Sequence, residues 1–147
     1  MIERIKSLAA AETAGMIAFR RELHQHPEVS YQEEWTAARL CAELEELGVP
    51  YERKGRRGIL ARLIGAAPGP HIAFRADFDA LAIQEETGLP YASREEGRMH
   101  ACGHDGHTAV LRTLVRTMAA NRDLLRGTVT FLFQDAEELP PGGAAAM

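Results

Sequence analysis

The stretch Thr128-Val129-Thr130-Phe131-Leu132-Phe133 consists only of β-branched, aliphatic and aromatic residues. Such an uninterrupted run predicts a strand buried within a sheet. A similar run, His71-Ile72-Ala73-Phe74-Arg75-Ala76, predicts another strand, buried on both faces. Acidic residues follow directly: Asp77 and Asp79 after residue 76, and Gln134-Asp135-Ala136-Glu137-Glu138 after residue 133. Since open α/β sheets bind ligands at the carboxyl ends of their strands, we expect both acidic groups to line one crevice.

Helical patterns precede and separate these strands. Apolar residues at helical spacing predict one helix from residue 3 to about residue 25, and a second that opens at Ser30 or Gln32 and closes at Gly48-Val49-Pro50. A third helix is predicted after the histidine-rich residues 100–107. Its apolar face is formed by Val110, Leu111, Leu114, Val115 and Met118.

The remaining segments complete a fold of the α/β class. Residues 51–54 and 59–64 favour short strands, and the glycine- and proline-rich residues 65–70 predict a loop. The order of buried strand, helix and buried strand predicts a mixed, largely parallel sheet flanked by helices. With 147 residues, 46% of them hydrophobic, the chain has the length and apolar content of one domain.

The stretch His100-Ala101-Cys102-Gly103-His104-Asp105-Gly106-His107 concentrates a thiol, three imidazoles and a carboxylate. Such a cluster is typical of metal sites, and its glycines let the backbone turn so that Cys102 and His104 aim at one point. We therefore expect these two residues to be a ligand pair rather than structural residues. His100 and His107 have two interpretations of equal weight: groups that support the ligands or contact substrate, and histidines satisfied within the structure.

The carboxylates have chemical and structural interpretations as well. Asp77 and Asp79 are interpreted as site residues, with a turn or helix cap as the alternative. Adjacent glutamates normally diverge, so one of Glu137 and Glu138 can bind metal while the other faces substrate, although surface glutamate pairs are common. A metal that activates water beside a free carboxylate is an arrangement that suits hydrolysis.

The other histidines and the second cysteine receive structural interpretations. His24 and His26, beside Pro27, are expected to be helix-terminus residues. Cys41 falls on the apolar face of the second predicted helix and is expected to be an inert core thiol.

Composition excludes several classes of partner. The 17 basic and 21 acidic residues give a formal net charge of −4, so we expect no nucleic-acid partner. No apolar run approaches the roughly 20 residues that span a bilayer, and the N-terminus lacks the apolar region of a signal peptide, so we expect no membrane partner. Two cysteines provide no disulfide framework, which favours a reducing, cytoplasmic location.

Four ordered motifs resemble the amidohydrolases that include hippurate hydrolase, N-acyl-amino-acid amidohydrolases and indole-3-acetyl-amino-acid hydrolases. These enzymes belong with the dinuclear metallopeptidases related to aminoacylase and carboxypeptidase G. The resemblance covers nearly the whole chain and matches the N-terminal half of the family. The motifs are Arg20-Arg21-Glu22-Leu23-His24-Gln25-His26-Pro27-Glu28, the stretch from Phe74 to Tyr91, the stretch from Met99 to His107, and Phe133-Gln134-Asp135-Ala136-Glu137-Glu138.

The resemblance implies a zinc-peptidase-like catalytic domain and assigns roles to its residues. According to the resemblance, Cys102, His104 and Glu138 are metal ligands, Glu137 is the general base and acid, and Asp79 orients the site. The implied reaction is hydrolysis of an N-acyl amino acid with an acetyl, benzoyl or similar acyl group. The family uses two divalent ions, with zinc, manganese, cobalt and nickel as candidates.

The chain departs from the family in two residues and in length. Phe78 stands where the family usually has Met, and Asp135 where it usually has Pro; neither change removes a ligand. Family members are more than twice as long, with further histidine ligands and a smaller domain that helps dimerise and close over substrate. We therefore expect residues 1–147 to be the N-terminal part of the metal-binding catalytic domain and to hold one metal ion or none. A homo-oligomer is one possible assembly state.

Two alternatives to an amidohydrolase remain. The first is a non-catalytic domain that binds metal or a partner chain through an unfinished sheet edge, whose exposed apolar residues would promote association or instability. The second is a peptidase of free dipeptides, which uses the same metal chemistry and differs in its substrate pocket.

Overall fold

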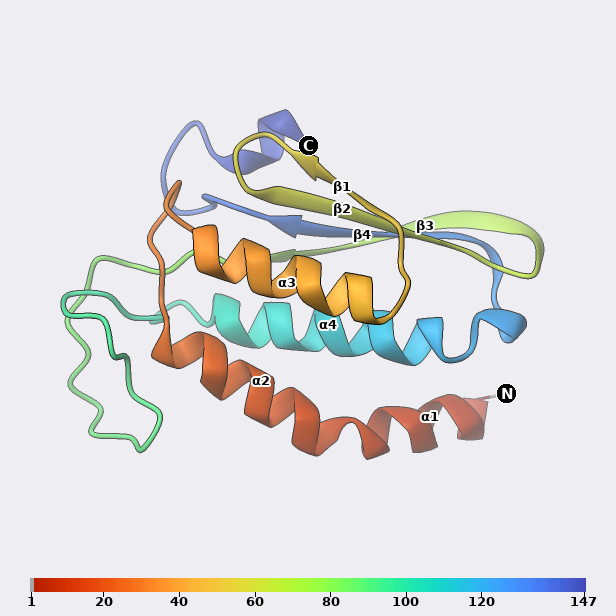
Figure 1. Cartoon of the computed structure of the whole chain (residues 1–147), viewed down its shortest axis with the longest axis horizontal. Helices are drawn as coiled ribbons and strands as arrows, with labels where there is room; N and C mark the ends of the chain where they lie inside the picture. Colours follow the sequence, from red (N-terminus) through yellow and green to blue (C-terminus); the bar gives the residue numbers. More distant parts are fainter. Residues whose placement is uncertain (1) are drawn as a thin grey trace.

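The structure is a computed structural model that describes residues 2–147. It contains a four-stranded sheet with helices on one face (Figure 1). The site-bearing segments lie at the left of this view, where α2 ends and α3 and α4 begin. Along the chain the elements are α1 (Ile2–Ala11), α2 (Thr13–Gln25), α3 (Glu34–Glu46), β1 (Tyr51–Lys54), β2 (Gly58–Ile64), β3 (Ala67–Asp77), α4 (His104–Ala119), η1 (Arg122–Leu124), β4 (Arg126–Gln134) and η2 (Gly143–Ala146).

The sheet is mixed, as predicted, but the prediction that it is largely parallel is wrong. Its strand order is β1-β2-β4-β3, and β1 with β2 and β2 with β4 are antiparallel pairs. Only β3 and β4 run parallel among the described strands. The physical reason lies in the connections: residues 55–57 close a tight hairpin between β1 and β2, whereas a parallel pair needs a crossover, which α4 supplies between β3 and β4.

The predicted strand at residues 71–76 forms, but the prediction that both of its faces are buried is wrong. β3 starts at Ala67, inside the predicted loop, and continues past a register shift before His71. Most of it is exposed, with Ile72 48% and Phe74 37% accessible, and burial is reached only at Ala76 and Asp77. The strand lies at the sheet edge, where β4 pairs with one side of it, and the helices leave much of its length uncovered.

The core lies between the sheet and the helices. Val129, Phe131 and Phe133 of β4 face the helices and pair in register with Leu63, Ala61 and Ile59 of β2. This period-two alternation places one face of each strand in the core. The helices add buried apolar side chains, which include Phe19, Leu23, Leu40, Leu44, Leu111 and Val115.

The helices differ from the sequence prediction in detail. The single helix predicted over residues 3 to about 25 is divided at Glu12, whose carboxylate turns toward α4 and accepts a hydrogen bond from Arg116 Nε at 3.0 Å. Cys41 is buried, as predicted. Val110, assigned to the apolar face of α4, is 58% exposed beside the uncovered β3 edge. From Ile2 onward, none of the helices has the length and apolar character needed to cross a membrane.

Candidate metal centre

Three segments that carry predicted site residues converge at one end of the sheet. Asp77 ends β3, His104 begins α4, and Glu137 and Glu138 follow β4. Because β3 and β4 are parallel, their carboxyl ends meet at the same edge. Two sets of potential ligands lie here, each with its atoms within 4.8 Å of one another, and they share His104: Cys102, His104 and Glu138, and Asp77, His104 and His107.

His104 is a buried imidazole with one nitrogen engaged and the other directed at carboxylates. Its Nδ1 lies 3.0 Å from the carbonyl oxygen and 3.2 Å from Oδ1 of Asp79. Both oxygens only accept, so Nδ1 carries a proton, and in the neutral form of the ring Nε2 is the nitrogen free to bind a metal. Nε2 lies 3.5 Å from Asp77 Oδ1, 3.9 Å from Glu137 Oε2 and 3.7 Å from Glu138 Oε1. Burial opposes protonation, but the bond to Asp79 and the charges of Asp77 and Asp79 raise the pKa of His104.

Asp79 links three segments of the site. Its Oδ2 accepts hydrogen bonds from Ser30 Oγ at 2.7 Å and from the backbone N–H of Glu138 at 2.9 Å, while Oδ1 faces His104. The residue is 1% exposed. Burial alone would raise the pKa of Asp79, but His104, the Glu138 N–H and Ser30 together lower it to about 2. The carboxylate is therefore ionised at neutral pH and holds a ligand from α4 and one from the β4 loop.

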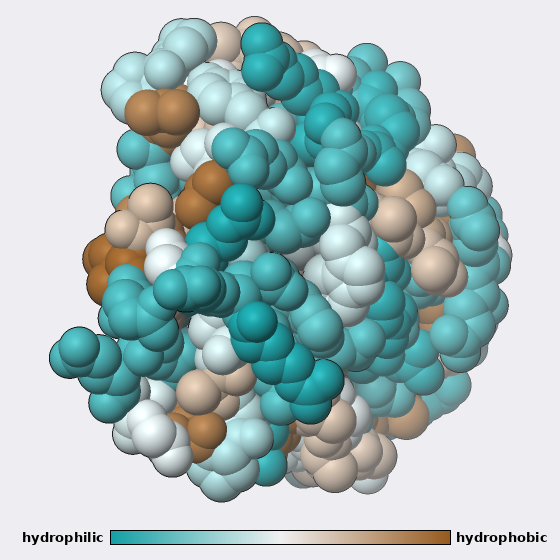
Figure 2. All heavy atoms as spheres, turned by 60° about the vertical axis from the view of Figure 1, so that its left-hand side comes forward, coloured by the Kyte–Doolittle hydropathy of each residue, from teal (hydrophilic) through white to brown (hydrophobic). Residues whose placement is uncertain are grey.

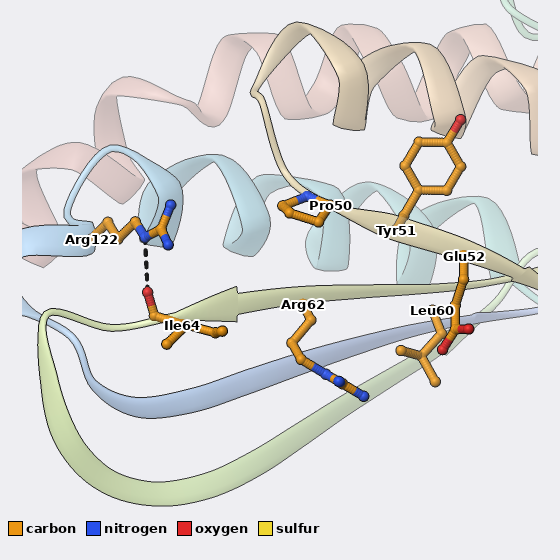
Figure 3. A pocket seen from close by; sticks show the side chains of 7 residues that line it. All are labelled: Pro50, Tyr51, Glu52, Leu60, Arg62, Ile64 and Arg122. Carbon is orange, nitrogen blue, oxygen red and sulfur yellow. Dashed lines mark hydrogen bonds between the residues drawn. The ribbon is translucent and has the colours of Figure 1, made fainter.

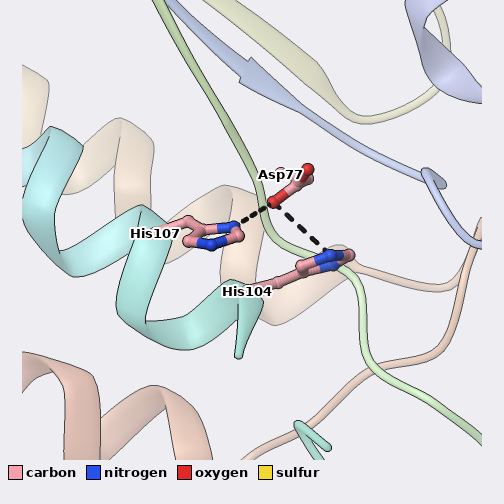
Figure 4. Close-up of side chains that lie close together, drawn as sticks. All are labelled: Asp77, His104 and His107. Carbon is pink, nitrogen blue, oxygen red and sulfur yellow. Dashed lines mark hydrogen bonds and ion pairs between the residues drawn. The ribbon is translucent and has the colours of Figure 1, made fainter. Parts of the chain in front are cut away.

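Asp77 and His107 lie next to His104 and complete the second set of potential ligands (Figure 4). His107 Nδ1 donates to Asp77 Oδ1 at 2.8 Å, and Arg75 Nη2 lies 3.3 Å from the other carboxylate oxygen. The hydroxyl of Thr108 donates to the Asp77 carbonyl at 2.8 Å, which ties the end of β3 to α4. The Asp77 carboxylate is largely buried, whereas the His107 ring is mostly exposed.

Cys102 and Glu138 complete the first ligand set. The thiol is exposed, and the neighbouring Glu138 carboxylate raises the pKa of Cys102. Glu138 Oε1 is buried and makes no hydrogen bond to any group within residues 2–147. An orphaned carboxylate oxygen beside an imidazole nitrogen and a thiol fits a divalent cation, because thiolate, imidazole and carboxylate are the ligands zinc prefers.

His100 does not contact the ligand atoms by hydrogen bonds. It is 4% exposed, and neither ring nitrogen has a hydrogen-bond partner in the part of the chain that the structure describes. Burial lowers the pKa of His100 to about 4, so the ring is neutral at pH 7. Its ring centroid lies 6.3 Å from that of His24.

His24 has a larger structural role than the sequence predicted. It lies in the last turn of α2, as expected, and is buried there. Nδ1 donates to Asp105 Oδ2 at 2.7 Å, and Nε2 lies 3.3 Å from Glu85 Oε1. Arg20 forms an ion pair with Asp105, with Nε 2.7 Å from Oδ2. The first turn of α4, which carries His104, is thereby tied to α2. The only sequence signal for this was that Arg20 and His24 fall within one motif of the family resemblance.

The pocket in Figure 3 lies away from these ligands. It has a volume of about 330 Å³ over β1 and β2, and Arg122 Nε donates to the Ile64 carbonyl at its rim at 2.8 Å. Glu52 is the single lining residue of a metal-binding type. Figure 2, in which the left-hand side of Figure 1 comes forward, shows a mainly hydrophilic surface with scattered hydrophobic side chains. The chemistry therefore centres on the ligand cluster rather than on this pocket.

Comparison with known proteins agrees with this arrangement. Residues 73–147 match the family described as Peptidase family M20/M25/M40, a range that contains both ligand sets. An N-acyl-L-amino acid amidohydrolase from Geobacillus stearothermophilus is 49% identical over 146 residues, which cover 99% of this chain and 40% of that protein.

Solved structures show the same fold. A crystal structure from methicillin-resistant Staphylococcus aureus superposes with a TM-score of 0.96 and 44% identity over 99% of this chain and 38% of that one. The YXEP protein of Bacillus subtilis, described as a dinuclear metal binding peptidase from the M20 family, gives a TM-score of 0.83 and 43% identity over 93% of this chain and 38% of that one. The chain thus spans about two fifths of the length of these relatives. The family match over half of the chain and these similarities confirm the resemblance seen in the sequence: the chain belongs to the M20/M25/M40 peptidase family, among relatives that include N-acyl-amino-acid amidohydrolases.

Proposed function

We propose that residues 1–147 form the N-terminal, metal-binding part of the catalytic domain of an amidohydrolase that cleaves N-acyl amino acids. The observation that carries this proposal is the convergence of Cys102, His104 and Glu138 within 4.8 Å, with the Glu137 carboxylate 3.9 Å from His104 Nε2. Packing gives no reason for a thiol, an imidazole and two carboxylates to meet at one point.

The ligand assignment follows from which atoms are free. His104 presents Nε2 because Asp79 holds Nδ1, and Glu138 presents the buried Oε1 that makes no hydrogen bond within residues 2–147. A divalent ion bound by these atoms and the Cys102 thiolate would polarise an amide carbonyl and lower the pKa of water to roughly 7. Zinc suits this donor set, and manganese, cobalt and nickel are further candidates. Asp77 and His107 are a second pair available to an ion on His104.

The two glutamates divide their tasks by exposure. The Glu138 side chain is 25% exposed and the Glu137 side chain 41% exposed, so Glu137 has the freer access to water and substrate. Its carboxylate accepts the proton of the attacking water and delivers it to the nitrogen of the leaving amino acid. Asp79 keeps His104 and the Glu138 backbone in place during this step.

The substrate class rests on the relatives. The Geobacillus relative is named for N-acyl-L-amino acids and matches 99% of this chain. We therefore expect a small N-acyl amino acid as substrate, with an acetyl, benzoyl or similar acyl group. A free dipeptide uses the same chemistry and is the comparison substrate in the assay below.

Metal binding is tested by titrating the purified chain with Co²⁺ and recording its absorption spectrum. We expect a thiolate-to-cobalt charge-transfer band that disappears in Cys102→Ser and a weaker affinity in Glu138→Ala. Cys41→Ser is the matched control, because Cys41 is a buried residue of α3 that belongs to neither ligand set, and it should retain the band. A band that persists in Cys102→Ser would show that the ligand assignment is wrong.

Catalysis is tested by hydrolysis of N-acetyl and N-benzoyl amino acids, compared with dipeptides, in the metal-loaded chain and in Glu137→Gln. We expect the metal-loaded chain to cleave N-acyl amino acids. The rate of Glu137→Gln should be lower by about 100-fold or more, while its metal binding is unchanged. Equal rates for the two proteins would contradict the role of Glu137.

A second candidate function is non-catalytic binding of a partner chain. One observation favours it: β3 lies at the sheet edge with Ile72 and Phe74 exposed. This function predicts metal binding without hydrolysis, and binding of a partner that is lost when lysine replaces Ile72.

A further inference from the structure

The loop that carries Glu137 and Glu138 begins with an unusual backbone conformation. Ala136 has a φ of +47°, and Tyr31 is the one other non-glycine residue with positive φ in the described chain. Residues with a Cβ rarely adopt this region, and they stay there only when their surroundings hold them. Ala136 is fully buried and directly precedes the two glutamates. Whatever holds Ala136 therefore sets the direction in which both carboxylates leave the sheet.

Glu33 contacts this residue directly. Its Oε1 accepts a hydrogen bond from the Ala136 N–H at 2.7 Å, and its side chain is fully buried. The Ala136 carbonyl is held on the other side by the N–H of Gly143 at 3.2 Å. The peptide groups flanking Ala136 are thus both fixed, one of them by a side chain from a distant part of the sequence.

Glu33 is free for this contact because another glutamate stabilises the helix next to it. Glu33 occupies the N-cap position of α3 but makes no capping hydrogen bond with its side chain. The free N–H groups of Trp35 and Thr36 donate instead to the two carboxylate oxygens of Glu28, at 3.0 and 2.8 Å. Glu28 therefore caps α3 in place of Glu33, and the Glu33 side chain contacts the loop after β4 instead.

The burial of Glu33 by itself destabilises the folded chain. Its Oε2 and the Asp135 Oδ1 are both buried without a hydrogen-bond partner among residues 2–147. Burial raises the pKa of Glu33 to about 7, and the nearby Asp135 adds to the effect. A buried carboxyl with an unsatisfied oxygen disfavours folding, so its position is better explained by what it holds.

We propose that Glu33 is a positioning residue for the metal centre: by holding the Ala136 N–H it fixes the loop from which Glu137 and Glu138 project. The loop then has two anchors, Glu33 on Ala136 and Asp79 on the Glu138 N–H at 2.9 Å, with Glu137 between them. This inference rests on the proposed function in so far as it assigns the two glutamates to metal and proton chemistry.

The test compares Glu33→Ala with Glu33→Gln, whose amide oxygen keeps the acceptor. Amide hydrogen exchange at Ala136, measured by NMR, reports the hydrogen bond without any metal. We expect exchange about tenfold faster or more in Glu33→Ala and near wild-type exchange in Glu33→Gln. Glu46→Ala, at the other end of α3, is the matched control, because the Glu46 side chain is 69% exposed and should leave exchange unchanged. Unchanged exchange in Glu33→Ala would overturn the inference.

A second measurement asks whether the anchor matters to the site. Titration with Co²⁺ should give an affinity about tenfold or more weaker in Glu33→Ala and within about threefold of wild type in Glu33→Gln. If exchange rises in Glu33→Ala but the affinity does not change, the residue holds the loop without positioning the ligands and the inference fails. Absence of Co²⁺ binding in the wild-type chain would instead refute the proposed function, while the exchange measurement still decides whether Glu33 holds the loop. If Glu33→Ala does not fold, Glu33→Asp, one methylene shorter, should show the faster exchange.

Discussion

The carboxylate of Asp79 lies 3.2 Å from Nδ1 of His104, and this contact determines which nitrogen of His104 is available to a metal. Asp79 also accepts the backbone N–H of Glu138, so one buried side chain orients ligands from two segments that are far apart in the sequence. The sheet brings these segments together, and Asp79 sets their mutual geometry.

Replacing Asp79 by Asn should weaken Co²⁺ binding by about 10- to 100-fold, because the amide lacks the charge that holds the His104 ring. Isothermal titration calorimetry on the folded chain measures this. Asp123→Asn is the control, since the Asp123 side chain is 65% exposed and touches no ligand. Equal affinities for the two variants would contradict the orienting role of Asp79.

Glu33 should make the stability of the chain depend on pH. Its pKa rises from the ordinary 4.5 to about 7 on folding, so between these values the folded chain binds more protons than the unfolded chain. Stability from this group is therefore greatest below pH 4.5, falls as pH rises toward about 7 and is constant above, a total change of about 3 kcal/mol.

Glu33→Gln removes this titration without removing the acceptor for Ala136. Urea unfolding at several pH values should show the variant gaining stability over wild type between about pH 4.5 and 7. A stability difference that does not vary with pH would show that Glu33 has an ordinary pKa.

Glu43 should stabilise the packing of α3 on α4. Its carboxylate is 5% exposed and lies 2.8 Å from Arg39 Nη1, 2.7 Å from Arg112 Nη2 and 3.4 Å from Arg116 Nη1. Burial alone would raise the pKa of Glu43, but Arg39 and Arg112 lower it, so the carboxylate is charged at neutral pH. Glu43→Ala leaves three guanidinium groups without this partner and should cost about 3 kcal/mol in urea unfolding.

The matched control for Glu43 is Glu46→Ala. Glu46 is 69% exposed and lies 3.9 Å from Arg116, so its loss should cost at most about 1 kcal/mol. Similar losses for the two variants would mean that burial of Glu43 does not matter.

The exposed edge of β3 should cause the chain to associate. Ile72 is 48% exposed there, and an unpaired strand edge with apolar side chains pairs readily with other chains. We expect the mass measured by light scattering to rise with concentration in the wild type and less in Ile72→Lys. Ile64→Lys tests the same change at a residue that is 57% exposed on β2, which lies between β1 and β4, and should not reduce association. A concentration-independent monomer mass would contradict this prediction.

Sequence patterns located most elements and the ligand cluster, because these depend on local residue order. The strands around residues 71–76 and 128–133 were visible as apolar runs, and Cys102 with His104 as a pair of metal-binding residues in a glycine-containing turn. Strand direction was not visible, because it depends on how β2, β3 and β4 are connected and ordered. The sequence predicts more burial of β3 than the structure has, for a related reason. An apolar run indicates that a strand tends to be buried, but it does not show whether another element packs against it.

Period, composition and motif are properties of the chain alone, and they are sufficient to predict the residue types of the site and their place after two strands. The contacts that hold those residues in place depend on tertiary packing. Glu33 reaches Ala136 across 103 positions and His24 reaches Asp105 across 81, and both contacts are hydrogen bonds between buried groups. Such pairs leave no periodic signal, because they arise only when packing removes both partners from water and leaves each as the other's acceptor or donor.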